Sequence, residues 1–328
     1  MFRRIAAAVS AAIISISLAS CSMTEKTATE VVHNTEVPPK MLFLGDSIAA
    51  GYGLEGYTSS DNYHCRSYSN MLKEQYEAEL HGKCRHTMVN KAVSGATSAD
   101  LINKIQSGEL DGDLGDCDAV VVSIGGNDLL DIMLELFNSM GISESGSFDS
   151  DNFDFLSAAG LFLSMNSDVD KALDQFDVNI KTIAEELGKR TEGTVYIQTL
   201  YDPLEYYSKF KRVTDFSSEK IGRLNEIITE NSACGYKVID VAADFEGKAE
   251  SLTNIADFDI HPNAEGHELI AKDVDEAFRT TGFTYTTTEY GDRHLSADGR
   301  IAVGSIIAGI AFLTLVGAVL LVRKKKEK

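Results

Sequence analysis

The sequence predicts a three-layer α/β domain over residues 40–281, built on a five-stranded parallel sheet. Two observations predict this fold class. Five short runs are apolar throughout and rich in β-branched residues, as strands buried on both faces of a parallel sheet are. Segments with the apolar spacing of helices lie between these runs. Strands that alternate with helices join by right-handed crossovers, which place helices on both faces of the sheet.

The expected strands and helices follow one another in a regular order. Helical spacing is clear from Val169 to Leu187 and again, more briefly, from Ile221 to Ile228. The segment 141–168 interrupts the alternation, and we expect an insertion there, near the mouth of the site. The expected strands are the runs Met41–Leu44, Thr87–Val89, Ala119–Ile124, Thr194–Ile197 and Lys237–Val241.

The start of the chain is typical of an exported protein. Residues 1–20 combine Arg3 and Arg4 with an apolar stretch and small residues, which is the layout of a secretory signal peptide. Leu18-Ala19-Ser20-Cys21 resembles the lipobox of bacterial lipoproteins, so we expect lipidation of Cys21. The alternative is an ordinary cleaved signal with a chance cysteine. Residues 21–39 lack periodicity and are expected to be a tether.

The end of the chain predicts a membrane anchor. Residues 301–322 contain no charged side chain, and as a helix they would span about 33 Å, enough for a bilayer core. A buried core helix is the alternative. The basic tail 323–328 would hold this end in the cytoplasm, so the domain would lie outside the cell membrane, joined to the helix by a stalk over residues 282–300.

Charge and cysteine content limit the partners and suggest the compartment. The net charge is −20, and a surface this acidic repels phosphate backbones, so we exclude nucleic-acid binding. Four cysteines besides Cys21 are an even number for an oxidising compartment, which favours disulfides. We prefer the pairs Cys65–Cys84 and Cys117–Cys234 among three pairings, because the second pair precedes two strand-like runs that could be neighbours. No spacing of Cys or His indicates a metal site.

Polar residues follow the expected strands, where open parallel sheets bind ligands. Ser47, in Gly45-Asp46-Ser47, lies where the chain turns from strand to helix and is a candidate nucleophile, or simply a helix cap. Gly95 and Asn127 follow the next two runs. A glycine N–H can approach a reacting oxygen and an asparagine amide can donate to one, although each residue could equally form a plain turn.

A candidate base follows the last run. His261 could accept the Ser47 proton, because neutral imidazole is the acceptor available near pH 7; the alternative is a loop histidine at a helix entrance. His267 is expected on the surface of the next helix. Asp202-Pro203, after the fourth run, either shapes an acyl pocket or forms a plain turn. A nucleophile, two donors and a base at the ends of different strands rarely arise by chance.

Four sequence blocks resemble the SGNH (GDSL) family of serine hydrolases. The resemblance spans residues 40–280. It implies a flavodoxin-like fold, ester hydrolysis through an acyl-serine, no metal or organic cofactor, and an oxyanion hole made by the N–H groups of Ser47 and Gly95 with the side chain of Asn127. The blocks are Phe43-Leu44-Gly45-Asp46-Ser47, Ser94-Gly95-Ala96-Thr97, Gly125-Gly126-Asn127-Asp128 and His261-Pro262-Asn263.

One position departs from the family pattern. The family places the triad aspartate three residues before the histidine, and Phe258 occupies that position here. We prefer Asp259 as the acid, since residues two apart in an extended segment face the same side; Asp257 is the second choice. Loss of the acid lowers the rate of a serine triad by about 10⁴.

The sequence therefore predicts a serine esterase outside the cell membrane that acts on acyl-carbohydrate or lipid esters. The acidic surface favours neutral carbohydrate esters slightly. The alternative is a surface binding module that keeps the fold without turnover, which the phenylalanine at 258 and the two anchors suggest.

Overall fold

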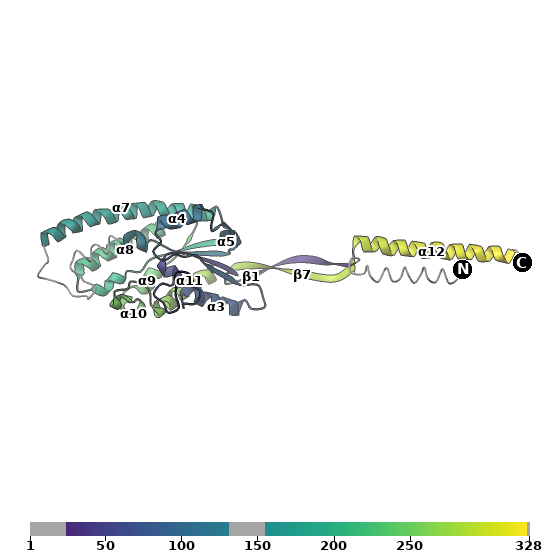
Figure 1. Ribbon diagram of the computed structural model, residues 1–328, viewed down its shortest axis with the longest axis horizontal. Helices are drawn as coiled ribbons and strands as arrows, with labels where there is room; N and C mark the ends of the chain where they lie inside the picture. Colours follow the sequence, from purple (N-terminus) through teal and green to yellow (C-terminus); the bar gives the residue numbers. More distant parts are fainter. Residues whose placement is uncertain (1–23, 131–154, 327–328) are drawn as a thin grey trace. The chain divides into compact units, whose positions relative to one another are not determined.

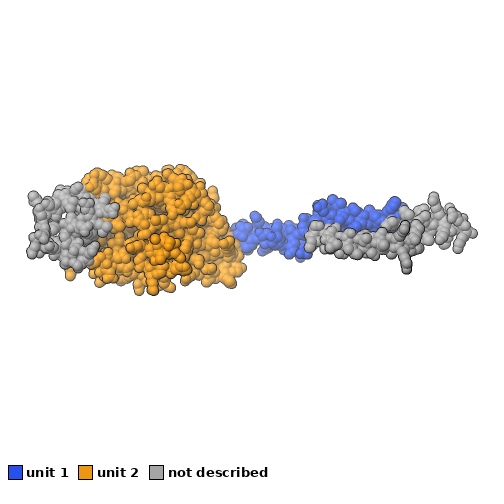
Figure 2. All heavy atoms as spheres, viewed as in Figure 1, with its two compact units in different colours: residues 1–33, 286–328 blue, residues 34–285 orange. Residues whose placement is uncertain are grey.

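The computed structural model describes residues 24–130 and 155–326 (Figure 1). The chain divides into two compact units, which Figure 2 distinguishes by colour. Residues 34–285 form one unit, and the described residues 24–33 and 286–326 belong to the other. The larger unit holds every predicted site residue except Cys21, which lies outside the described residues, as does the predicted signal peptide 1–20.

The larger unit is built on a five-stranded sheet in which all neighbouring strands are parallel. The strand order is β3-β2-β4-β5-β6, so the chain reverses its direction of travel across the sheet at β2. Ligands of such sheets bind beyond the carboxyl ends of the strands at this reversal. The predicted fold class is confirmed. The strands are β2 (Lys40–Gly45), β3 (Thr87–Asn90), β4 (Ala119–Ser123), β5 (Thr194–Gln198) and β6 (Lys237–Ile239).

Alternate strand residues pack into two separate cores, one on each face of the sheet. In β2, Leu42 and Leu44 join one core, whereas Met41 and Phe43 join the other. This is the period of two that strand geometry imposes. Full burial of a side chain such as Phe43 stabilises the fold by about 1.5–3 kcal/mol. Both faces of the sheet are therefore covered, which explains why the strands are continuous apolar runs.

The helices form the two outer layers (Figure 1). One core includes residues of α4 (Ser98–Gln106), α5 (Asp111–Asp116), α7 (Phe155–Gly188) and α8 (Lys211–Glu230). The other includes residues of α3 (Tyr68–Glu79), α9 (Val241–Phe245) and α11 (Ala264–Thr281). Shorter elements connect them, namely α2 (Ser47–Ala50), η1 (Pro203–Tyr207), η2 (Asn231–Cys234), α10 (Ala249–Leu252) and η3 (Ile255–Asp257).

The predicted disulfides are wrong, because the cysteines at positions 65, 84, 117 and 234 are all free thiols. Cys65 and Cys84 lie before and after α3, whose twelve residues span about 18 Å, whereas bridged Cα atoms lie less than about 7 Å apart. Cys117 and Cys234 precede β4 and β6, and β5 lies between those strands. The thiols of Cys65 and Cys117 donate instead to the carbonyls of Asn62 and Leu114, at 3.3 Å each.

The predicted tether and stalk contain regular structure. β1 (Thr24–Thr35) and β7 (Phe283–Leu295) pair in a two-stranded sheet. Most of the predicted tether, residues 24–35, is therefore a β-strand. Both segments are rich in threonine, whose branched side chain favours strands.

The helix α12 (Ala297–Lys326) covers the segment 301–322, which we predicted to cross a membrane. Within the described part of the chain, no helix is both long and apolar enough to span a bilayer. The structure thus gives no support to the predicted span. The side chains of residues 313, 316 and 318–326 lie outside the described part.

Candidate active site

The nucleophile candidate Ser47 lies at the first position of α2, immediately beyond β2. The turn needs glycine at position 45, where φ is +124° and an added Cβ would lie 1.8 Å from the carbonyl oxygen of Ser123 on β4. Asp46 caps α2 by accepting the N–H of Ile48 at 3.0 Å. Gly45 thus lets β2 lie close to β4 while Ser47 emerges at the reversal point of the sheet.

The structure brings Ser47, His261 and Asp259 into one hydrogen-bonded chain. The Nε2 atom of His261 lies 2.9 Å from the Oγ atom of Ser47, although 214 positions separate the two residues. The Nδ1 atom of His261 contacts the Oδ1 atom of Asp259, which also accepts the backbone N–H of His261 at 3.0 Å. With a proton on Nδ1, the free lone pair of Nε2 faces the serine hydroxyl, as a general base requires.

The conformation of the loop before His261 determines which of Asp257 and Asp259 lies beside the imidazole. Phe258 adopts a left-handed conformation with φ of +62°, and the backbone N–H of Asn254 closes the loop on the carbonyl of His261 at 3.0 Å. The chain leaves this turn with Asp259 beside the imidazole ring, whereas Asp257 ends η3 with an exposed side chain. Asp259, the acid that we preferred from the sequence, is therefore the aspartate that contacts the imidazole of His261.

Electrostatics keep Asp259 ionised beside the ring. Burial opposes ionisation, but hydrogen bonds from the ring and the backbone N–H of His261 hold the pKa of Asp259 below its ordinary value. Its side chain is about one-third exposed, so solvent screens part of this attraction. An ionised acceptor at Nδ1 fixes the orientation of the imidazole and favours its protonated form during proton transfer.

The three candidate oxyanion donors lie at neighbouring strand ends. Among the described residues, the backbone N–H groups of Ser47 and Gly95 have no hydrogen-bond acceptor, so both remain available to a substrate oxygen. Gly95 has φ of +84° and open space where a Cβ would stand. The Nδ2 atom of Asn127 donates to the carbonyl of Ala96 at 2.9 Å, which places the amide beside the Gly95 loop with a second N–H to spare.

A hydrogen-bond network that we did not predict ties the two donor loops together. The carboxylate of Asp128 accepts the backbone N–H of Ser98 at 2.9 Å and also the hydroxyl of that residue. Asn179 on α7 donates to the same hydroxyl at 2.7 Å. Asp128 belongs to the block Gly125-Gly126-Asn127-Asp128, in which we had assigned a role only to Asn127. Its position next to Asn127 was the available signal.

One further residue differs from the sequence interpretation, and another near the site was missed. His267, expected on a helix surface, is fully buried, stacks on Tyr68 at 5.8 Å and accepts its backbone N–H at 3.3 Å. Burial lowers the pKa of His267 to about 3, so it stays neutral and is no second base. Tyr52, which we did not single out, packs its ring on His261 with centroids 4.6 Å apart.

The carboxyl of Asp46, next to Ser47, is buried within the larger unit. Burial raises its pKa to about 7, while the N–H of Ile48 and the charge of His261 lower it and Asp128 raises it further. A carboxyl whose pKa is higher in the folded than in the unfolded chain binds more protons when folded. The free energy of unfolding therefore falls as the pH rises from 3.8 to about 7.

We expect Asp46→Asn to remove this loss of stability. Asparagine still caps α2 but cannot ionise. The difference in unfolding free energy between variant and parent should grow by about 1–4 kcal/mol in favour of the variant between pH 4 and pH 8. Urea titrations at both pH values measure it. A difference that stays constant over this range would mean that Asp46 titrates at its ordinary pKa.

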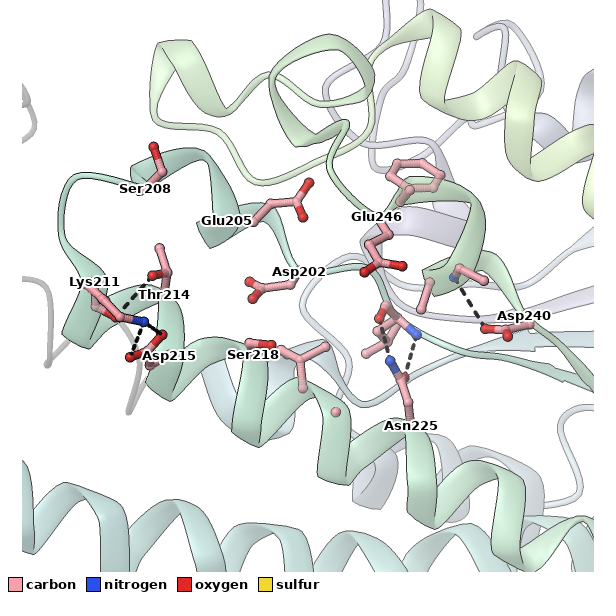
Figure 3. A pocket seen from close by; sticks show the side chains of 16 residues that line it. Asp202, Glu205, Ser208, Lys211, Thr214, Asp215, Ser218, Asn225, Asp240 and Glu246 are labelled. Atoms are coloured by element: carbon pink, nitrogen blue, oxygen red, sulfur yellow. Dashed lines mark hydrogen bonds and ion pairs between the residues drawn. The ribbon is translucent and has the colours of Figure 1, made fainter.

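The structure also contains a polar pocket of about 670 Å³, whose lining side chains Figure 3 shows. Asp202, Glu205 and Glu246 line it, and Lys211 pairs with Asp215 at 2.8 Å at one side. Asp202 caps η1 and accepts the hydroxyl of Ser217 at 2.5 Å. Ser47, Asn127 and His261 are not among its lining residues, so this pocket is not where the candidate nucleophile acts.

Solved structures and a curated relative resemble this chain. The lipase Lip_vut3 from a goat rumen metagenome has a TM-score of 0.50 at 20% identity and covers 73% of this chain and 96% of its own. An extracellular lipase from Streptomyces rimosus has a TM-score of 0.51 at 18% identity, covering 73% and 99%. At these identities the likeness shows the fold alone.

The uncharacterized protein YpmR of Bacillus subtilis (strain 168) is 23% identical over 202 residues. That match covers 59% of this chain and 66% of the relative, just under two thirds of its length. A family model matches residues 43–269, which is more than half of the chain and includes all four blocks around Ser47, Gly95, Asn127 and His261. The chain therefore belongs to the GDSL-like lipase/acylhydrolase family.

Proposed function

We propose that this protein is a serine esterase that hydrolyses carboxylic esters through an acyl-serine intermediate. The observation that carries the proposal is the contact of 2.9 Å between His261 Nε2 and Ser47 Oγ, with Asp259 on the other ring nitrogen. A nucleophile, a base and an orienting acid in this order activate a hydroxyl near neutral pH. Membership of a lipase/acylhydrolase family supports the ester bond as the target.

In the proposed acylation step, His261 accepts the hydroxyl proton while Ser47 Oγ bonds to the ester carbonyl carbon. The N–H groups of Ser47 and Gly95 and the amide of Asn127 stabilise the tetrahedral oxyanion. The C–O bond to the alcohol then breaks, and the alcohol leaves with the proton from His261 Nε2. Water repeats the sequence on the acyl-serine, with His261 again as base, and releases the acid.

The alternative of a catalytically silent binding module loses its main support. It rested on the missing aspartate at position 258, and Asp259 occupies the acid's place beside the imidazole instead.

We also propose that the protein acts outside the cytoplasm and is attached to the cell membrane. This part of the proposal rests on the signal-like residues 1–20, Cys21 and the apolar segment 301–322.

An alkyl fluorophosphonate probe tests the proposed function. The folded protein should become labelled on Ser47, because only an activated serine attacks the phosphorus centre at a useful rate. Peptide mapping identifies the labelled residue, and prior unfolding of the sample serves as the control. A folded sample that takes up no label at Ser47 would rule out the esterase.

We expect Asn127→Ala to lower kcat for p-nitrophenyl butyrate by about 10²–10³. The amide donates to the oxyanion, which exists only in the transition state and intermediate, so KM should change little. Steady-state kinetics separate the two constants, and thermal melting checks that the variant is folded. A loss confined to KM would instead assign Asn127 to substrate binding.

A further inference from the structure

A small apolar pocket opens beside the proposed catalytic residues. Its volume is about 100 Å³, several times the roughly 10–15 Å³ that one water molecule needs. Three of its lining residues, Ile48, Gly126 and Ile260, are the chain neighbours of Ser47, Asn127 and His261. Part of its wall is therefore formed by residues that flank the proposed catalytic groups.

The side chains that line this pocket are mainly apolar and provide few hydrogen-bonding groups. Its lining includes Ile221 on α8 and Leu204 on η1. The two hydroxyls among the lining residues are already engaged: Ser217 donates to Asp202 at 2.5 Å, and Tyr201 donates to the carbonyl of Ile260 at 2.8 Å. A sugar hydroxyl placed here would lose its water partners without replacement, so the pocket suits a hydrocarbon chain.

We infer that this pocket binds the acyl chain of the substrate and that the acyl group is a hydrocarbon chain longer than acetyl. The inference rests on the proposed function. The acyl group stays on Ser47 through both chemical steps, so it needs a pocket continuous with the nucleophile, whereas the alcohol must leave towards water. This changes the substrate expected from surface charge, because an acetylated carbohydrate would leave the pocket empty.

The wall at Ile221 limits the length of chain that the pocket accepts. Leu200 and Ile221 line both this pocket and the polar pocket of about 670 Å³, so they separate the two. Truncating the Ile221 side chain is expected to widen the smaller pocket towards the larger one, and enlarging it is expected to fill the smaller pocket. Ile221 is half-buried and is not one of the proposed catalytic residues, so its substitution tests the preferred chain length.

The test uses the full-length protein with p-nitrophenyl esters of two, four, six and eight acyl carbons. The parent kcat/KM should rise from acetate by about fourfold per buried methylene until the pocket is full. Ile221→Trp should lower kcat/KM for the longer esters at least about tenfold relative to kcat/KM for acetate. Ile221→Ala should shift the best substrate to a longer chain. Val178→Trp, at an exposed position of α7, adds the same bulk elsewhere and should behave as the parent.

Labelling of Ser47 by the fluorophosphonate separates this inference from the proposed function. A protein that is labelled, but prefers acetate or ignores chain length, keeps the esterase and overturns the acyl pocket. A series of alkyl acetates with growing alcohol chains provides the other arm. If kcat/KM rises along that series and Ile221→Trp abolishes the rise, the pocket holds the alcohol and the inference is wrong.

Discussion

Replacing Ser47 with alanine is expected to lower kcat for p-nitrophenyl butyrate by about 10⁶. The variant lacks the oxygen that forms the acyl-enzyme, and no other described hydroxyl lies within hydrogen-bonding distance of His261 Nε2. The residual rate over the reaction in water would come from the oxyanion donors and from substrate binding. Burst and steady-state kinetics measure the loss, and the fluorophosphonate label should disappear with it.

Ser123→Ala is the matched control for this experiment. Ser123 is also buried and ends β4, the strand beside β2, but its hydroxyl has no hydrogen-bond partner among the described residues. Loss of an unpartnered hydroxyl should leave activity and stability close to those of the parent. If Ser47→Ala hydrolyses the ester at the parental rate, the proposed mechanism fails. If Ser123→Ala is as inactive as Ser47→Ala, the loss reflects disruption of the sheet.

The sheet was predictable because its burial pattern is local. A strand covered on both faces must be apolar at every position, and the runs at 41–44, 119–124 and 194–197 mark their strands to within about two residues. The turn at Gly45 could also be predicted from a local signal, since polar residues after an apolar run mark the end of a strand. These features depend on a few consecutive residues and on no distant partner.

Features that depend on strand order or on distant packing were not predictable. The pairing of Cys117 with Cys234 failed because the insertion of β5 between their strands is a property of the whole sheet. His267 lies on an amphipathic helix, and only the packing of Tyr68 against it decides that it is buried. Nothing in the sequence marks the left-handed backbone at Phe258, since glycine or asparagine normally takes that conformation.

We expect Asp259→Asn to lower kcat by about 10⁴ with little change in KM. The neutral side chain no longer stabilises the imidazolium that forms when His261 takes the serine proton. It can also turn its amide towards Nδ1, which would force the ring proton onto Nε2 and remove the base that faces Ser47. The shape of the side chain is kept, so thermal melting should stay close to that of the parent.

Asp257→Asn makes the same change two positions earlier and decides between the two aspartates. Asp257 is exposed, and the described structure gives its side chain no hydrogen bond, so the variant should retain the parental kcat. If Asp257→Asn were the inactive variant, the loop would have to rearrange when substrate binds, and the contact between Asp259 and His261 would belong to the resting state only. If both variants kept full activity, His261 would work without a carboxylate, and Asp259 would serve only to shape the loop that begins at Asn254.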